Sequence, residues 1–481
     1  MNLSERVGPG GLTRRKFLRG VGAAGTLLMM GPVGGKMSQA YGLNLPEPGP
    51  ADWPSFGYDL QNTRFNVRES RLGRDNVSRL KLKWSFQADG VIQTTPTVIG
   101  DTLFFGSQSG QEFALETRTG EPRWRFRVEK QEALRYMRQG VRSSSYYSDG
   151  RVYFGDGTTK VRCVDAATGE EIWQTQLTDD PTAQTRSSPA VYNGRVVLGY
   201  SSTRGNAEIV CLDADTGAVS WRFKTAPEGA GGSVWGSPAI DEKEHIVYNV
   251  TGSAKAFMPP GPMLYTESIL AHDLESGELL WYSQARPRSP HDLDFGCHPM
   301  IFDARAPAGY RGNVVRNCVA AGSKGGFFTW DRYTGERYWK VMLTNATASG
   351  GLQQDSTAVA YNRIFAVSTA VTPKGTMSVT AALDAYTGDI VWWVPNSSAN
   401  HAPVAVANGV FYQGLMDGTL EALDAESGRV LWNYKLPTAH RGGIAIANGI
   451  LYAGTGEPSG ATEEIVRAGR YSMYAFSIDG I

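Results

Sequence analysis

The side chains of this sequence that could do chemistry together are charged, and they recur at comparable places in an internal repeat. Most of them lead into the first strand of a repeat unit, and Lys324 lies in a turn that follows such a strand. Cationic side chains outnumber acidic ones, with Arg142, Arg186, Lys324, His401, His440 and Arg441 against Asp292, Asp294 and Asp355. Guanidinium and ammonium groups form strong hydrogen bonds with carboxylates and other oxyanions. The set therefore predicts a site for an anionic ligand.

The repeat that positions these residues has the pattern apolar-Asp-x-x-Thr/Ser-Gly-x-x-x-Trp. Its copies end at Trp124, Trp173, Trp221, Trp281, Trp339, Trp392 and Trp432. The polar-Gly part is a turn signal, because a short polar side chain caps its own backbone and glycine supplies a positive φ. Apolar runs on both sides predict a hairpin, and a second pair of strands precedes most copies. Four strands per unit are typical of a propeller blade.

The number of units predicts how the ring closes. The last unit, YSMYAFSIDGI, lacks a Trp strand, and a spare one lies near the other end of the chain in LKLKWSFQAD, with Trp84. Pairing the two would complete an eighth blade and remove the exposed sheet edges. We expect an all-β fold, a single eight-bladed β-propeller over residues 52–481, with residues 41–51 as a linker. Each Trp should pack on the neighbouring blade.

The first forty residues resemble an export signal. Thr13-Arg14-Arg15-Lys16-Phe17-Leu18 is similar to the twin-arginine motif, and a Gly/Ala-rich run follows it. Residues 1–40 are therefore expected to be a twin-arginine signal and the mature protein to be periplasmic. The apolar run is too short for a membrane span.

Composition excludes some partners. The 47 basic and 47 acidic residues balance, which gives no electrostatic case for nucleic acid. None of the four cysteines lies in C-x-x-C-H, so no attached haem is expected and a redox enzyme would need a separate electron acceptor. Cys297 and Cys318 lie on two runs that could pair, which would allow a disulfide in an oxidising compartment.

The blade signature resembles the tryptophan-docking motif of PQQ-dependent alcohol dehydrogenases and their non-enzymatic relatives. DWPSFGYDLQNTRFN at 52–66 is similar to the opening segment of that family, notably its polyvinyl-alcohol dehydrogenase branch. The resemblance implies a role for three residues. Trp235 in GSVWGSP would be the floor under the quinone, Asp294 in SPHDLDF the base that takes the alcohol proton, and Lys324 in GSKGGFFTWD the cation at the quinone oxygens.

The same resemblance implies two cofactors, PQQ and calcium. Residues that lead into the inner strands would hold PQQ, namely Gln93, Arg142, Ser143, Ser144, Arg186, Ser187 and His401, together with Trp235 and Lys324. Asp294 and Ser253 would hold calcium. Ser253 replaces the family's Asn, and only Ser202 or Thr203 stands where the family's Glu is expected.

Two other functions fit the sequence. One is a quinone-free hydrolase or lyase that uses Asp294 and the basic residues on a small anionic substrate, similar to polythionate hydrolases. The other is a non-catalytic scaffold similar to the propeller of outer-membrane assembly. Our leading interpretation is that the protein is a periplasmic oxidoreductase. Its substrate would be a small molecule, an alcohol that it oxidises.

Overall fold

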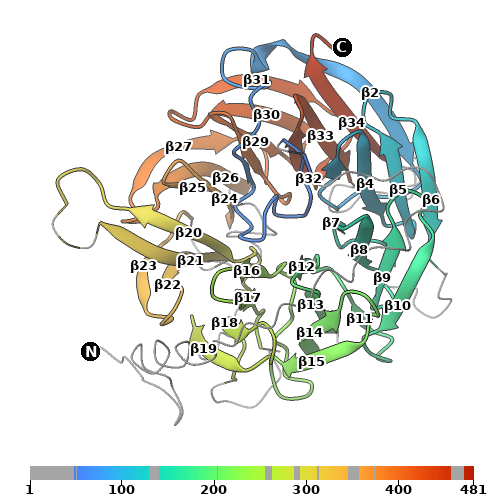
Figure 1. The fold of residues 1–481 in the computed structure, drawn as a ribbon. Coiled ribbons are helices and arrows are strands. Elements are labelled where there is room, and N and C mark those ends of the chain that lie inside the picture. Colours follow the sequence, from blue (N-terminus) through green and yellow to red (C-terminus); the bar gives the residue numbers. More distant parts are fainter. Residues whose placement is uncertain are drawn as a thin grey trace, which may run out of the picture.

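The fold is known from a computed structural model of the chain (Figure 1). The structure describes residues 48–49, 51–128, 140–202, 204–254, 263–286, 293–310, 312, 314–324, 326–344, 357–372, 375–456 and 471–481. Residues 1–40, with the twin-arginine motif, lie outside this range. In the described part, no helix has the length and apolar character needed to cross a membrane.

The described strands form eight antiparallel sheets that stand around a common axis, as blades of a propeller (Figure 1). The prediction of an eight-bladed all-β propeller is therefore confirmed. From the axis outwards, blade 1 contains β3 (Thr97–Ile99), β4 (Thr102–Ser107), β5 (Gln111–Glu116) and β6 (Pro122–Arg127), and blade 2 contains β7 (Tyr146–Ser148), β8 (Arg151–Gly155), β9 (Lys160–Asp165) and β10 (Glu171–Gln176). Blade 3 contains β12 (Ala190–Tyr192), β13 (Arg195–Ser202), β14 (Ala207–Asp213) and β15 (Val219–Lys224), and the short β11 (Ala183–Gln184) also pairs with β13. Blade 4 contains β16 (Ala239–Asp241), β17 (Ile246–Val250), β18 (Ser268–Asp273) and β19 (Leu279–Gln284).

The remaining blades repeat this arrangement. Blades 5 to 8 contain β20 (Met300–Arg305), β21 (Val315–Ser323), β22 (Gly326–Asp331) and β23 (Arg337–Val341); β24 (Thr357–Ala360), β25 (Arg363–Thr372), β26 (Gly375–Asp384) and β27 (Ile390–Asn396); β28 (Ala405–Ala407), β29 (Val410–Gly414), β30 (Thr419–Asp424) and β31 (Val430–Lys435); and β32 (His440–Ala447), β33 (Ile450–Thr455), β34 (Tyr471–Ile478) and β2 (Leu80–Ala88). The short elements β1 (Phe65–Asn66) and η1 (Val77–Arg79) precede β2.

Strand β2 closes the ring as the sequence predicts. It pairs antiparallel with the C-terminal β34, and Trp84 lies opposite Ala475. One blade is therefore built from both ends of the described chain. The ring is closed, and each sheet lies between two neighbouring sheets.

The repeat tryptophans hold adjacent blades together. The ring of Trp221, for example, packs on Gly277 in the turn of the next blade, where a Cβ would lie 2.6 Å from the ring and φ is 72°. Its Nε1–H donates to the carbonyl of Leu274 at 2.9 Å. Trp339 differs, because its ring packs on Gly388 in the same way but its Nε1–H has no hydrogen-bond partner among the described residues. The packing of adjacent blades thus depends on the contact of the tryptophan ring with the next blade more than on the hydrogen bond of its indole N–H.

The segment before β2 lies across the centre of the ring (Figure 1). Its backbone forms hydrogen bonds with the inner part of seven blades: Trp53 with Val98, Pro54 with Tyr147, Leu60 with Ile240, Gln61 with Ile301, Thr63 with Val359, Arg64 with Val406 and Ala51 with Asn448. The buried guanidinium of Arg64 donates to the carbonyls of Phe56, Val404 and Ile444. The residues 51–66, which we call the central segment, therefore tie the inner strands to one another.

The disulfide that the sequence allows is not formed. Cys318 is a free, buried thiol on β21, and its cross-strand partner is Phe302. Cys297 instead hydrogen-bonds through its backbone N–H to Gly322, four residues further along that strand. The two segments that contain Cys297 and Cys318 do lie side by side. Their register, however, places the two cysteines at different heights along the strands.

Candidate functional site

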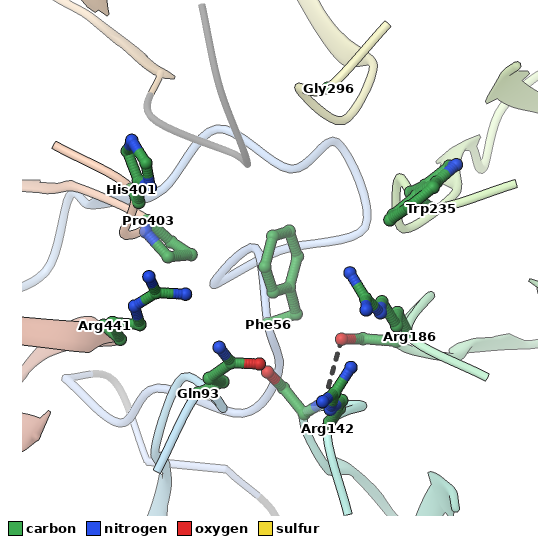
Figure 2. Close-up of a pocket in the computed structure, with 11 residues that line it drawn as sticks. Phe56, Gln93, Arg142, Arg186, Trp235, Gly296, His401, Pro403 and Arg441 are labelled. Atoms are coloured by element: carbon green, nitrogen blue, oxygen red, sulfur yellow. Dashed lines mark hydrogen bonds between the residues drawn. The ribbon is translucent and has the colours of Figure 1, made fainter. Parts of the chain in front are cut away.

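An open cavity, with about 560 Å³ of empty space when the solvent at its mouth is included, lies at the axis where the inner strands begin (Figure 2). It is lined by Phe56, Gln93, Arg142, Ser144, Arg186, Ser188, Trp235, Gly296, His401, Pro403 and Arg441. Most of these residues directly precede an inner strand, which explains why the repeat could identify them. Phe56 comes from the central segment and lies in the middle of the view, with the cationic side chains around it.

Three arginines of the lining, Arg142, Arg186 and Arg441, form what we call the arginine cluster. In the part of the chain that the structure describes, no carboxylate lines the cavity. Arg142 donates to the side-chain oxygens of Gln184 at 3.2 Å and Gln108 at 3.3 Å, so these two partners are neutral amides. A concentration of positive charge in a concave site favours anionic ligands.

Arg186 is held between an amide side chain and the indole ring of Trp235. Its Nε donates to Gln184 at 3.1 Å, and its guanidinium carbon lies 4.7 Å from the centre of the Trp235 ring. Burial, with repulsion from Arg441, lowers the pKa of Arg186 to about 10. A bound anion would lower the cost of keeping this guanidinium charged inside the protein.

The histidines of the cationic set are neutral in the folded protein. Burial, helped by Arg441, lowers the pKa of His401 to about 4, and His401 lines the cavity. His440 is fully buried in β32 and does not line the cavity, and burial lowers its pKa to about 3. The cationic character of the site at neutral pH therefore comes from arginine.

The side chains of consecutive serines before the inner strands point alternately into the cavity and away from it. Ser144 and Ser188 line the cavity, and their hydroxyls accept backbone N–H groups of Thr95 at 2.8 Å and Ser144 at 2.9 Å. Each hydroxyl keeps its proton for a ligand, because a hydroxyl both donates and accepts. Ser143 and Ser187, predicted as cofactor residues, are buried and turn elsewhere: Ser143 accepts from Gly155, and Ser187 donates to the carbonyl of Gly236.

Asp294 and Lys324 lie together beside this cavity. The Nζ of Lys324 is 3.2 Å from Oδ2 of Asp294, and Oδ1 accepts the backbone N–H of Ser253 at 2.6 Å. Gly252 permits this arrangement, because a Cβ there would lie 2.6 Å from Asp294 Oδ1 and 3.3 Å from Trp235 Nε1. The structure thus brings Asp294, Lys324, Ser253 and Trp235 together.

Two further residues, to which no sequence motif points, complete this arrangement. Glu267 is 1% exposed; it accepts the hydroxyl of Ser253 at 3.1 Å and forms a 2.9 Å ion pair with Arg286. Burial raises the pKa of Glu267 while Arg286 lowers it. We call Asp294, Glu267, Ser253, Lys324 and Arg286 the carboxylate network. Glu267 and Arg286 flank strands rather than occupy a repeat position, so no sequence pattern points to them.

Some predicted residues cannot be placed. Asp292, Asp355 and Thr203 lie outside the described residues. Ser202, the other residue considered in place of a calcium-binding glutamate, donates its hydroxyl to Asp180 at 2.5 Å.

The two implied cofactors differ in how the site suits them. A planar polycarboxylate such as PQQ suits the cavity, since its lining offers arginine, serine and glutamine donors beside an indole ring. The guanidinium group of Arg186 covers one face of the Trp235 ring, so a quinone ring stacked on that face would have to displace it. Calcium does not suit the carboxylate network: each carboxylate already pairs with a protein cation, and the described residues contain no cluster of three or more His, Cys, Asp or Glu side chains suited to a metal.

Known proteins similar to this chain belong to β-propeller families. The family model described as "Glucose/ethanol/alcohol dehydrogenase, beta-propeller domain" matches residues 53–360, and the model "Outer membrane protein assembly factor BamB" matches residues 265–478. The chain is 26% identical over 435 residues to a polyvinylalcohol dehydrogenase of a Pseudomonas species, a match that covers 78% of this chain and 66% of that protein. It is 26% identical to the quinohemoprotein alcohol dehydrogenase of Comamonas testosteroni, over 59% of this chain and 45% of that protein.

Solved structures share the fold. The crystal structure of the Comamonas testosteroni quinohemoprotein alcohol dehydrogenase superposes with a TM-score of 0.79 at 19% identity, covering 90% of this chain and 81% of that one. A europium-containing methanol dehydrogenase gives a TM-score of 0.76 at 18% identity, over 89% of this chain and 98% of that one. The chain therefore spans less than two thirds of the two curated relatives named above but nearly the whole of this second structure.

Proposed function

Because the chain belongs to the β-propeller-domain family of glucose, ethanol and alcohol dehydrogenases, we propose that it is an exported quinoprotein that oxidises an alcohol in the axial cavity. The observation that carries the proposal is the juxtaposition of the two charged groups. An arginine-lined cavity beside an indole ring adjoins a carboxylate held by a lysine. The first suits a polycarboxylate cofactor, and the second suits the removal of a proton.

PQQ would be held by the arginine cluster, the hydroxyls of Ser144 and Ser188, and the amide of Gln93. Trp235 would pack against its plane. When bound, this cofactor supplies a two-electron acceptor, so the protein has only to bind and orient the reactants.

Asp294 acts in this proposal as the general base. The backbone N–H of Ser253 fixes one carboxylate oxygen, and the other faces the ammonium of Lys324. Both interactions favour the ionised carboxylate that can accept the hydroxyl proton of an alcohol. Lys324 then stabilises negative charge that develops on a neighbouring oxygen.

The relatives and the sequence together support a substrate class, a separate electron acceptor and a location. A polyvinylalcohol dehydrogenase and alcohol dehydrogenases are among the similar proteins, so we expect a small or polymeric substrate with a secondary or primary hydroxyl. Electrons would leave to a separate acceptor protein. The twin-arginine motif near Arg14 supports export to the periplasm.

The direct test is reconstitution. Purified protein is titrated with PQQ while tryptophan fluorescence and quinone absorbance are followed, and alcohol oxidation is measured with an artificial electron acceptor. We expect saturable PQQ binding and alcohol-dependent dye reduction. Protein that binds no PQQ and reduces no dye with any alcohol would contradict the proposal.

A second candidate function rests on the contact between Arg186 and Trp235. Since the guanidinium packs 4.7 Å from the ring centre, the cavity also suits a small oxyanion that pairs with Arg186 where it stands. A hydrolase or lyase of an anionic substrate would use Asp294 as its base without a quinone. Turnover of a polythionate by quinone-free protein, with no response to PQQ, would favour this candidate over the dehydrogenase.

A further inference from the structure

We infer that the carboxylate network of this chain needs no divalent cation, because the guanidinium of Arg286 and the ammonium of Lys324 supply the positive charge that a bound metal ion would supply. This concerns the resting structure of the site and goes beyond the proposed oxidation of an alcohol. It also assigns a positioning role to Glu267 and Arg286.

The two carboxylates of the network are joined through a single residue. The backbone N–H of Ser253 donates to Asp294 at 2.6 Å, and its hydroxyl donates to Glu267 at 3.1 Å. Because both carboxylates bind the same serine, their negative charges lie near each other and repel. Two nearby carboxylates of this kind require a cation to remain ionised together.

Each carboxylate has its own cation. Arg286 pairs with Glu267 at 2.9 Å, and Lys324 pairs with Asp294 at 3.2 Å. Arg286 is fixed in turn, since it also donates to the carbonyl of Leu293 at 3.4 Å. Two negative and two positive groups leave the network neutral, as a divalent cation between two carboxylates would.

Electrostatics then disfavours an added metal. A divalent ion would have to displace Arg286 or Lys324 from its carboxylate, or else leave a surplus of positive charge beside the arginine cluster. Calcium also prefers six to eight oxygen ligands, and both carboxylates already have partners. Glu267 therefore positions Asp294 through Ser253, with Arg286 in the place of the ion.

The test asks whether removal of a protein cation creates a metal site. Four proteins are compared: the natural chain, Arg286→Met, Lys324→Met, and the double variant Glu267→Gln/Arg286→Met, which removes both charges of the buried pair while keeping its shape. Bound calcium is measured by elemental analysis after gel filtration, and thermal unfolding is followed in about 5 mM Ca²⁺ and in EDTA.

We expect the natural chain to retain no stoichiometric calcium and to unfold at the same temperature in both buffers. Arg286→Met should unfold at a lower temperature in EDTA and regain about 3–10 °C in Ca²⁺, since a ligand that binds only the folded state stabilises it. The double variant should not respond. Lys324→Met, which frees Asp294 near the cavity, should respond in the same direction and covers the case in which Arg286→Met does not fold.

Two results would overturn the inference: calcium in the natural chain whose removal lowers its unfolding temperature, or single variants that respond to Ca²⁺ no more than the double variant. None of these measurements uses PQQ or turnover. A failure of the proposed dehydrogenase activity would therefore leave the metal result intact.

Discussion

The arginine cluster and the carboxylate network are neighbours at the axis, but their charges are balanced in different ways. Arg186 packs on a neutral ring and a neutral amide, and burial lowers its pKa. Asp294 and Glu267 each have a cation within 3.2 Å. Arg186 stands ready for the charge of a ligand, whereas the two carboxylates are paired within the chain. The difference separates binding from chemistry: one side should determine affinity and the other side rate.

The largest effect should come from Asp294→Asn. The amide keeps the size of the side chain but cannot accept a proton, so we expect PQQ-loaded protein to lose alcohol oxidation by about 10²–10⁴-fold. PQQ affinity, measured by fluorescence titration, should change little, because the ligand is held by the other group. A variant that oxidises alcohol at the natural rate would remove Asp294 from the mechanism and break the comparison.

Arg186→Met should act on affinity instead. Loss of one charge-assisted hydrogen bond costs about 1.5–3 kcal/mol, which corresponds to roughly 10–100-fold weaker PQQ binding. Ligand-free protein should unfold at the same or a higher temperature, since a desolvated cation has been removed. Arg118→Met is the matched control, because the side chain of Arg118 is 78% exposed. Equal losses in both variants would mean that general charge, and not the cavity, governs binding.

The neutral histidine of the cavity predicts a pH dependence. The pKa of His401 is about 4 in the folded protein, below its ordinary value of 6.5, so between these values the unfolded chain binds more protons. Stability should therefore fall as pH drops from about 6.5 to about 4, with His401 contributing roughly 1–3 kcal/mol. His272 and His440, both with a pKa lowered to about 3 by burial, add to the same trend.

Thermal unfolding of His401→Gln between pH 4 and 7.5 should show a shallower dependence than that of the natural chain. A saturating anion next to Arg441 should also make the natural chain less sensitive, because it offsets one cause of the low pKa. An unchanged slope in both experiments would show that folding does not shift the pKa of His401.

The smallest effects should distinguish two adjacent serines. Ser143→Ala and Ser144→Ala each remove a hydroxyl that accepts a backbone N–H, so each should cost about 1 kcal/mol of stability. Only Ser144 lines the cavity, so only Ser144→Ala should weaken PQQ binding, by a few-fold. Weaker binding in both variants would place the boundary of the ligand site one residue further out.

The sequence was sufficient for the fold because the relevant interactions are local. Each Asp-x-x-Thr/Ser-Gly turn forms its own hairpin, and the missing Trp strand at one end matches the extra strand with Trp84 at the other. The candidate site was predictable where it follows this repeat, as for Gln93, Arg186 and His401. It was not predictable where the direction of a side chain decides, because a shift of one residue turns it to the other face, as with Ser143 and Ser144.

Positions outside the repeat carried no comparable signal. Phe56 reaches the cavity from the central segment, far along the chain from the strands around it. Glu267 and Arg286 meet because they extend the paired strands β18 and β19, where the backbone N–H of Ala285 donates to Glu267, but Glu267 reaches Ser253 only through the irregular connection after β17. Contacts of this kind depend on the three-dimensional arrangement of irregular segments, and no periodic pattern records them.

The central segment and strand β2 also set the order in which the molecule can be completed. These residues are among the first of the described chain to be synthesised, yet they pair with strands from seven blades and with β34 at the other end. The earliest part of the chain must therefore wait, without its native partners, until the last strand has been made. Contacts between such distant residues slow folding because the intervening chain must be ordered before they form. Completion of the ring is thus a late, cooperative step, and a nascent chain that lacks only its final strand has an open blade edge and an incomplete sheet.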